Sequence, residues 1–273
     1  MQHFSTDPRE LAASLWRNRV LIRTLVQREV LGRYRGSTLG ILWSFFNPVL
    51  MLAVYTFVFS VVFQARWGTD SSGSKAEFAL ILFAGMLVFN LFAECVNRAP
   101  SLILGNASYV KKVVFPLEVL PWVSFGAASF HAVISLGIWL LFSLFVFGQP
   151  HLTVFLFPLL LLPLTLFTMG ISWLLASLGV YLRDVAQIVG IVVTICMFLT
   201  PIFYPLTAIP EAYRGVLYLN PLTLIIEQTR DLLIFGKGMA WKQYAVLTTS
   251  SAIIAWLGFA WFQKTRKGFA DVL

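Results

Sequence analysis

Six long apolar runs leave this 273-residue chain few ways to fold. Each run has about 20 residues or more, the length that an α-helix needs to cross the hydrocarbon core of a bilayer. The chain is 59% hydrophobic and only 12% charged, whereas a soluble domain is about 25% charged. We therefore expect an all-α integral membrane protein with six transmembrane helices, which lie in residues 39–63, 79–97, 117–147, 152–180, 186–205 and 243–262.

Residues 1–38 precede the first apolar run and predict a region with an amphipathic helix. Asp7 can cap its first turn, Pro8 suits the first helical position, and Glu10 completes the pattern of a capping box. Such a helix prefers the membrane interface, although a cytosolic helix that packs on a partner has the same pattern. The two faces of the helix are an apolar one with Leu11, Leu15, Ile22, Leu25 and Val26, and a basic one with Arg17, Arg23 and Arg28.

Lysines and arginines are distributed unevenly between the two sides of the predicted spans. With the N-terminus inside, 14 of the 20 fall on the inner side, as the positive-inside rule requires. The N-terminal region (1–38) and the tail (264–273) are therefore both expected in the cytoplasm, on either side of a six-span domain (39–263). The net charge of +8 fits attraction to anionic headgroups, so we expect membrane lipids and not nucleic acid as its partner.

The sequence REVLGRYRGSTLGILWSFFNPVL, residues 28–50, passes directly from a basic segment to an apolar one. Gly32, Gly36 and Gly40 are spaced four apart, so they form either a smooth strip on a continuous helix or an elbow between an in-plane helix and the first span. Asn47 and Pro48 lie inside the apolar part. Because Pro48 leaves a backbone carbonyl without its helical donor, we expect a kink that faces protein or a water-filled path.

Three connections between spans carry recognisable patterns. Residues 97–116, NRAPSLILGNASYVKKVVFP, predict a short docking helix between loops. Residues 181–187, YLRDVAQ, form a tight inner connection in which Arg183 and Asp184 either cap helix ends or face a partner. Outside, residues 222–235 have a helical pattern that is too short and too charged to cross the bilayer unaided, so we expect a re-entrant or interfacial helix there.

Signatures of enzymes and of ion-coupled carriers are missing. The Gly236-Lys237 pair lacks the other residues of a P-loop. Three scattered histidines form no metal-binding pattern, and His131 is expected to be a hydrogen-bonded residue within the membrane. Glu94 and Glu118 fall near span ends, whereas carriers keep ionisable groups near the bilayer midplane. We therefore expect no catalytic residue, no metal and no cofactor, and a source of energy outside this chain.

Aromatic residues form a four-spaced row on the first span, at Tyr55, Phe59 and Phe63. If the row faces lipid or packed protein, its role is only apolar. If it faces a path, it offers flat stacking surfaces and one hydroxyl to a sugar chain. The sequence alone favours the first alternative.

Five motifs occur in one order: REVLGRYRGSTLGILWSFFNPVLMLAVYTFVF, YVKKVVFPLEVLP, YLRDV, TPIFYP and LNPLTLIIEQTRDLL. Together they resemble the permease subunits of ABC exporters for bacterial cell-surface polysaccharides such as O-antigen, capsule and teichoic acid. The similarity runs through nearly the whole chain, and Thr200 stands before Pro201 where many family members have serine. The resemblance implies a homodimer of six-span subunits in the bacterial inner membrane, two copies of a separate ATP-binding cassette ATPase, and a lipid-linked glycan as substrate.

The resemblance also implies roles for individual residues. The first and fifth spans would border the translocation path, with Tyr55, Phe59, Phe198 and Tyr204 facing it. A coupling helix near residues 98–114 and the second inner loop would meet the ATPase through Pro100, Leu102, Asn106, Tyr109, Arg183 and Asp184. The outer gate region (205–240) would include Tyr213, Glu227 and Arg230. The pyrophosphate of the lipid carrier would enter beside Arg28, Arg33 and Arg35, because guanidinium groups suit phosphate oxygens.

Other functions fit parts of the sequence. An exporter of the same family for a drug or a small lipid would share the fold, and co-purification of a lipid-linked glycan would argue against it. A self-contained ion-coupled carrier would be active without any ATPase. An integral-membrane enzyme would need clustered acids, bases or metal ligands.

Overall fold

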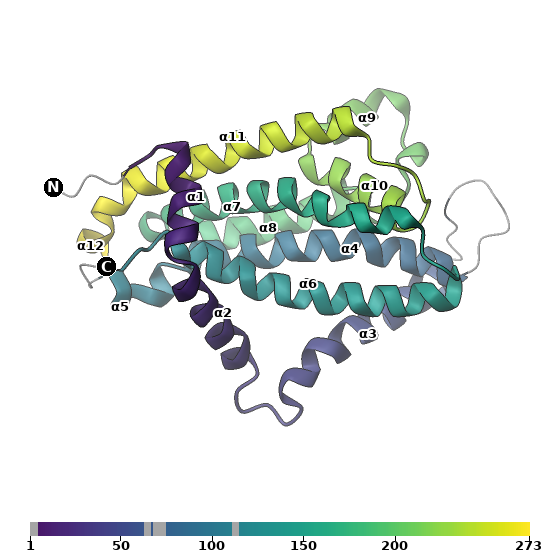
Figure 1. Cartoon of the computed structure of the whole chain (residues 1–273), viewed down its shortest axis with the longest axis horizontal. Coiled ribbons are helices and arrows are strands. Elements are labelled where there is room, and N and C mark those ends of the chain that lie inside the picture. Colours follow the sequence, from purple (N-terminus) through teal and green to yellow (C-terminus); the bar gives the residue numbers. More distant parts are fainter. Residues whose placement is uncertain (1–4, 63–66, 68–74, 111–114) are drawn as a thin grey trace.

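The computed structural model describes residues 5–62, 67, 75–110 and 115–273. These residues form helices and turns and no strand (Figure 1). The α-helices are Pro8–Arg17 (α1), Arg19–Arg33 (α2), Trp43–Tyr55 (α3), Lys75–Arg98 (α4), Ala107–Val110 (α5), Val119–Val146 (α6), Phe157–Tyr181 (α7), Val185–Leu199 (α8), Glu211–Tyr218 (α9), Pro221–Leu233 (α10), Trp241–Thr265 (α11) and Phe269–Val272 (α12). A π-helical turn, Thr56–Val62 (η2), extends α3, and the 3₁₀ turns are Gly40–Leu42 (η1), Ala99–Ser101 (η3), Leu104–Asn106 (η4), Leu152–Leu156 (η5), Leu206–Ala208 (η6) and Arg266–Gly268 (η7).

Five helical segments of the described chain are long and apolar enough to cross a membrane. They match five of the six predicted spans and comprise Gly40–Phe59, Ala76–Ser101, Val119–Val146, Leu152–Tyr181 and Trp241–Val272. The remaining expected span is residues 186–205. The helix observed there, α8, is shorter than expected, because it has only 15 residues and is about 22 Å long. Thr200 is extended, with φ −81° and ψ 138°, since the following Pro201 disfavours a helical conformation at this position.

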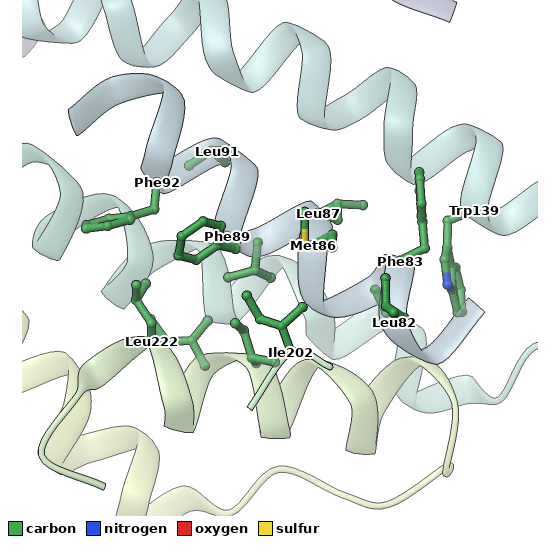
Figure 2. Packing of buried hydrophobic residues seen from close by; sticks show 14 of the residues in the cluster. Leu82, Phe83, Met86, Leu87, Phe89, Leu91, Phe92, Trp139, Ile202 and Leu222 are labelled. Atoms are coloured by element: carbon green, nitrogen blue, oxygen red, sulfur yellow. The ribbon is translucent and has the colours of Figure 1, made fainter. Parts of the chain in front are cut away.

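α4 lies at the centre of the fold. Its residues from 78 to 89 are all buried, and it contacts α6, α7, α8 and α10. Figure 2 shows Phe89 and Phe92 of α4 in one apolar cluster with Leu222 of α10 and with Ile202, which follows α8. A helix that is apolar on all sides is typical of a buried position. α4 is therefore the element against which the surrounding helices are placed.

α7 and α11 approach each other closely at two glycines. A Cβ atom added to Gly258 would lie 2.0 Å from the backbone oxygen of Gly170, and one added to Gly170 would lie 2.5 Å from that of Ile254. Small residues permit such close approach in membranes, where helix association depends on van der Waals packing. The two glycines therefore set the distance between these helices.

The N-terminal helix begins at the predicted residue and is then divided in two. Asp7 caps α1 and accepts a 2.8 Å hydrogen bond from the backbone N–H of Arg9. Glu10 pairs with Arg17 at 2.5 Å, and the backbone N–H of Asp7 donates to Ser5 Oγ at 3.2 Å, so Glu10 does not close a capping box. The division between α1 and α2 falls at Asn18, which is the C-cap of the first helix and the N-cap of the second.

The glycine-rich junction between α2 and α3 forms an elbow (Figure 1). Gly36 and Gly40 have φ values of +85° and +52°, which glycine adopts far more readily than other residues. A Cβ atom added at Gly32, Gly36 or Gly40 would meet no described atom within 4 Å. The elbow is thus confirmed, and the alternative of a smooth strip for another helix is wrong.

The apolar face of α2 covers α6 of the same chain. Leu25 packs with Val119 and Val123, and a Cβ atom added to Gly126 would meet the side chain of Val26 at 2.5 Å. The predicted interfacial helix is therefore attached to the spanning helices along its length.

The start of α1 and the C-terminus lie toward the end of the molecule that also holds α5 and α12, whereas α9 and α10 lie toward the other end (Figure 1). A buried ion pair stabilises the end that holds α5 and α12. In this pair, Arg266 Nη1 lies 2.6 Å from Glu118 Oε2. Ser14 of α1 donates to the other oxygen of Glu118 at 3.1 Å, and the indole of Trp173 donates to its carbonyl. This cluster joins the N-terminal helix, α6, α7 and the C-terminal segment.

Candidate functional site

The predicted coupling segment is not a single helix. It consists of η3, η4 and the four-residue α5, since Pro100 and Gly105 both disfavour a continuous helix, and residues 111–114 lie outside the described residues. Pro100 and Leu102 are buried, and a Cβ atom added to Gly179 of α7 would lie 2.0 Å from the Pro100 oxygen. The side chain of Asn106 donates to the Leu102 carbonyl at 2.9 Å. Pro100 and Leu102 thus anchor the segment to α7, and the Asn106 bond stabilises the segment itself.

The second inner connection lies between α7 and α8. Arg183 and Asp184 are both exposed, and the Asp184 side chain makes no capping hydrogen bond although the residue occupies the N-cap of α8. The prediction that the Asp184 side chain caps a helix end is therefore wrong. Because Gly179 touches Pro100, the two inner connections are neighbours at one end of the molecule.

The three arginines predicted to meet a pyrophosphate have different surroundings. Arg28 donates a 2.8 Å hydrogen bond to the hydroxyl of Tyr109, which links α2 to the coupling segment. Arg35 is exposed on the elbow. Arg33 lies 2.6 Å from the carboxylate of Glu94, so its charge is already balanced. Arg28 and Arg35 are consequently the more accessible of the three to an anion.

A polar cluster forms where the end of α2 meets α4 and α6. His131 of α6 lies 3.2 Å from Glu94 of α4 and 3.1 Å from Arg33. The hydroxyl of Tyr34 lies 2.9 Å from the other ring nitrogen of His131. Burial raises the pKa of Tyr34, so the phenol keeps its proton.

The expectation that His131 is a hydrogen-bonded residue is confirmed by this cluster. Tyr34 and Glu94 were missed as its partners. Arg33 and His131 are 98 positions apart, so no local pattern in the sequence indicates that they meet. The available signal was that two ionisable residues, Glu94 and His131, lie inside apolar runs of the sequence. Ionisable residues inside a membrane normally have a partner.

A cavity of about 530 Å³ opens beside the polar cluster, between α3, α4, α6 and the elbow. Asn47 and Pro48 line it from α3, which continues as one helix through Pro48, so these two residues face the space that the sequence predicted, while a kink at Pro48 stays a prediction. Tyr55, one of the predicted path residues, lines it as well. Glu94 and His131 form part of the wall, which gives the cavity both polar and aromatic surfaces.

Two of the predicted path residues are joined by an aromatic residue that the sequence did not single out. Phe59 of η2 stacks on Phe203 with ring centroids 5.5 Å apart, and Phe203 lies 5.7 Å from Phe198 of α8. The hydroxyl of Tyr204 donates to the Phe198 carbonyl at 2.8 Å. Phe203 belongs to the motif TPIFYP, which was the available signal. Phe63, the third member of the predicted row, lies outside the described residues.

The predicted gate region contains η6, α9 and α10. α10, at residues 221–233, agrees within two residues at each end with the helix expected at 222–235. Tyr213 of α9 is 66% exposed. Arg230 of α10 has the opposite environment, because only 1% of its side chain is exposed.

The guanidinium of Arg230 joins three segments of the chain. It donates to the carbonyl oxygens of Pro201 at 2.6 Å and Ile202 at 2.7 Å, which follow α8, and to that of Ile81 in α4. It also pairs with Glu227 at 2.9 Å. A Cβ atom added to Gly85 would lie 2.9 Å from the guanidinium, so α4 leaves space for it. Arg230 thus holds α10 of the gate region against the central helix and against the residues that follow α8.

Clusters of three or more His, Cys, Asp and Glu side chains that could hold a metal ion are absent from the part of the chain that the structure describes. The two cysteines, Cys95 and Cys196, are both free. The arrangement therefore consists of helices, an internal cavity, aromatic contacts and two inner connections.

Comparison with known proteins gives one consistent result. Residues 20–234 match the family described as ABC-2 type transporter. An O-antigen export system permease protein RfbA from Myxococcus xanthus is 31% identical over 264 residues, which cover 96% of this chain and 98% of the relative. A protein of the same name from Klebsiella pneumoniae is 28% identical over 93% of this chain and 95% of the relative. The polysialic acid transport protein KpsM of Escherichia coli is 23% identical over 86% of this chain and 91% of the relative. The chain belongs to the ABC-2 type transporter family.

Proposed function

We propose that this chain is the membrane subunit of an ATP-driven exporter that moves a lipid-linked cell-surface polysaccharide, similar to O-antigen, across the bacterial inner membrane. The observation that carries the proposal is the similarity to an O-antigen export permease over 96% of this chain and 98% of the relative. A similarity of this extent includes both inner connections, the cavity, the aromatic contacts and the gate region. The chain supplies the passage, and a separate ATPase subunit supplies the energy.

The proposed arrangement in the membrane has six crossings, with α8 and the residues after it as the fifth. An even number of crossings places both termini on the same side of the membrane, and the excess of lysine and arginine on that side makes it the cytoplasmic one. Two copies would form the exporter. The apolar side chains that α8 exposes, which include Ile188, Ile191, Ile195 and Phe198, offer a surface for the second copy next to the path.

Coupling to the ATPase would use the inner end. Two copies of the ATPase would dock on the coupling segment near residues 98–114 and on the Arg183–Asp184 connection. A push on the coupling segment would reach α7 through the contact between Pro100 and Gly179. It would reach α2 through the hydrogen bond between Arg28 and Tyr109. Leu102 and Asn106 would keep the segment rigid during this step.

Translocation requires an enclosed path, because each unsatisfied polar group of a glycan costs about 2–7 kcal/mol in hydrocarbon. We place this path along Tyr55, Phe59, Phe198 and Tyr204, with the ring of Phe203 between those of Phe59 and Phe198. Aromatic faces let sugar rings slide by stacking. The lipid pyrophosphate would enter beside Arg28 and Arg35, with Arg33 at the border of the cavity. Tyr213, Glu227 and Arg230 would belong to a re-entrant outer gate.

Deletion of the gene for this chain should cause one glycan to accumulate on its lipid carrier inside the cell and to disappear from the surface. The reason is that synthesis continues while the passage is missing. Extraction of carrier lipids, followed by mass spectrometry of the attached sugars, measures this, and re-expression of the chain is the control. Normal surface glycan without accumulation on the carrier, or accumulation of a drug or sugar-free lipid alone, would contradict the proposal.

A further inference from the structure

We propose that the cavity between α3, α4 and α6 binds the uncharged, hydroxyl-rich sugar residues that adjoin the lipid pyrophosphate, and not the pyrophosphate itself. This inference rests on the proposed function. It adds a defined sugar-binding site within one subunit, at the border of the elbow.

The size and position of the cavity suit such a ligand. Its volume of about 530 Å³ falls within the range of about 300–1,000 Å³ that small-molecule sites occupy. Arg33, the last residue of α2, and Tyr34, which follows it, contribute to the cavity wall. A lipid headgroup that rests beside the exposed Arg35 of the elbow would therefore place its first sugars at the cavity.

Three asparagine side chains give the cavity hydrogen-bonding capacity that the described chain leaves unused. Asn47 of α3 and Asn90 and Asn97 of α4 all line it, and within the described residues none of the three makes a side-chain hydrogen bond. Each amide both donates and accepts, as a sugar hydroxyl also does. All three residues are exposed, so their amides are accessible to a ligand that enters the cavity. A polyhydroxyl ligand supplies both kinds of partner.

The charge of the cavity argues against an anion. Arg33 is the nearest cation, and its guanidinium lies 2.6 Å from Glu94. Glu94 lies in the cavity wall and would repel a pyrophosphate there. A carboxylate instead accepts hydrogen bonds from hydroxyl groups. Arg33 and Glu94 therefore balance each other's charge in the cavity wall, and His131 lies beside them.

Aromatic residues complete the surface that a sugar ring would use. Trp43 and Tyr55 line the cavity from the two ends of α3, and Phe83 lines it from α4. Flat aromatic faces bind the apolar face of a sugar, while the amides and the carboxylate meet its hydroxyl groups. One cavity thus offers both kinds of contact that a carbohydrate needs.

Photo-cross-linking tests which ligand occupies the cavity. A photoreactive benzoylphenylalanine replaces Asn90, and the matched control carries it in place of Val133, which is 68% exposed on α6. The complete complex with its ATPase is irradiated with carrier lipids extracted from cells that lack this chain. A second sample uses the same extract after mild acid has cleaved the sugar–pyrophosphate bond and washing has removed the sugars. Mass spectrometry identifies the adduct.

We expect a sugar-containing adduct at position 90 with the intact extract, at least about tenfold above the control position, a ratio equivalent to about 1.4 kcal/mol. The same sugar-free adduct from both extracts, or no adduct at all, would overturn the inference. These outcomes are distinct from failure of the proposed function, which would appear earlier as the absence of lipid-linked glycan from cells that lack the chain.

A cavity-filling variant provides an independent measurement. Ala132→Trp places a large side chain in the cavity that Ala132 lines, and Val133→Trp adds the same side chain to the exposed side of the same helix. Export of surface glycan should fall about tenfold in the first variant and stay within about twofold in the second, a limit of about 0.4 kcal/mol. A second variant, Asn90→Leu, removes the amide at similar size and should also lower export. It provides the test if Ala132→Trp fails to fold. Near-normal export by a folded Ala132→Trp variant would refute the sugar site.

Discussion

Replacement of Arg230 by methionine should lower the free energy of unfolding by about 3–5 kcal/mol, the range found when one partner of a buried ion pair is removed. The side chain is 1% exposed and pairs with Glu227. Its loss would leave that carboxylate and the carbonyl oxygens of Pro201 and Ile202 without the donor that they share. We expect a much lower midpoint of thermal unfolding for the purified chain in detergent.

Arg17→Met is the matched control for this prediction. Arg17 also pairs with a glutamate, Glu10, but its side chain is 59% exposed. An exposed pair contributes about 0–1 kcal/mol, so this variant should unfold almost as the wild-type chain does. Equal and small shifts for both variants would show that Arg230 does not hold the gate region against α4.

Replacement of Gly258 by leucine should prevent the normal packing of α7 against α11. A Cβ atom at this position would lie 2.0 Å from the Gly170 oxygen, so the helices must separate along their contact. Overpacking of a well-filled core costs about 1–3 kcal/mol and occasionally more, and a clash with rigid backbone belongs at the upper end. Folded yield from membranes and the midpoint of thermal unfolding both measure the effect.

Gly137→Ala is the control for Gly258→Leu. Gly137 also lies inside a long helix, α6, but an added Cβ atom would meet no described atom within 4 Å. Alanine is favoured over glycine in helices by about 1 kcal/mol, so this variant should be as stable as the wild-type chain or more stable. A folded and fully stable Gly258→Leu variant would refute the close contact between α7 and α11.

The sequence predicts those features that depend on neighbouring residues. The apolar runs locate the spanning helices, and Asp7 with Pro8 locates the start of α1, because caps act within one turn. Local rules also explain why the fifth predicted span ends too late. Pro201 removes Thr200 from the helix, and the effect of proline on the preceding residue was available in the sequence.

The remaining features depend on contacts between distant segments. Local sequence rules predict that a charged residue such as Arg230 lies at the surface. Its burial cannot be predicted from the sequence, because its main partners are the backbone carbonyls of Pro201, Ile202 and Ile81. Backbone carbonyls carry no signal in the sequence. The meeting of Arg33 with Glu94 likewise depends on how α2 bends at the elbow and where α4 lies. Sequence periodicity identifies helices and their faces, but it does not say which faces meet.

Transport by purified components tests the central claim most directly. The chain and its ATPase partner are reconstituted into liposomes that carry the accumulated lipid-linked glycan, and a membrane-impermeant glycosidase reports which leaflet exposes the sugars. We predict that ATP drives the glycan across only when both subunits are present, and that the isolated chain does not turn over nucleotide. Glycan movement without the ATPase, or nucleotide hydrolysis by this chain alone, would contradict the account.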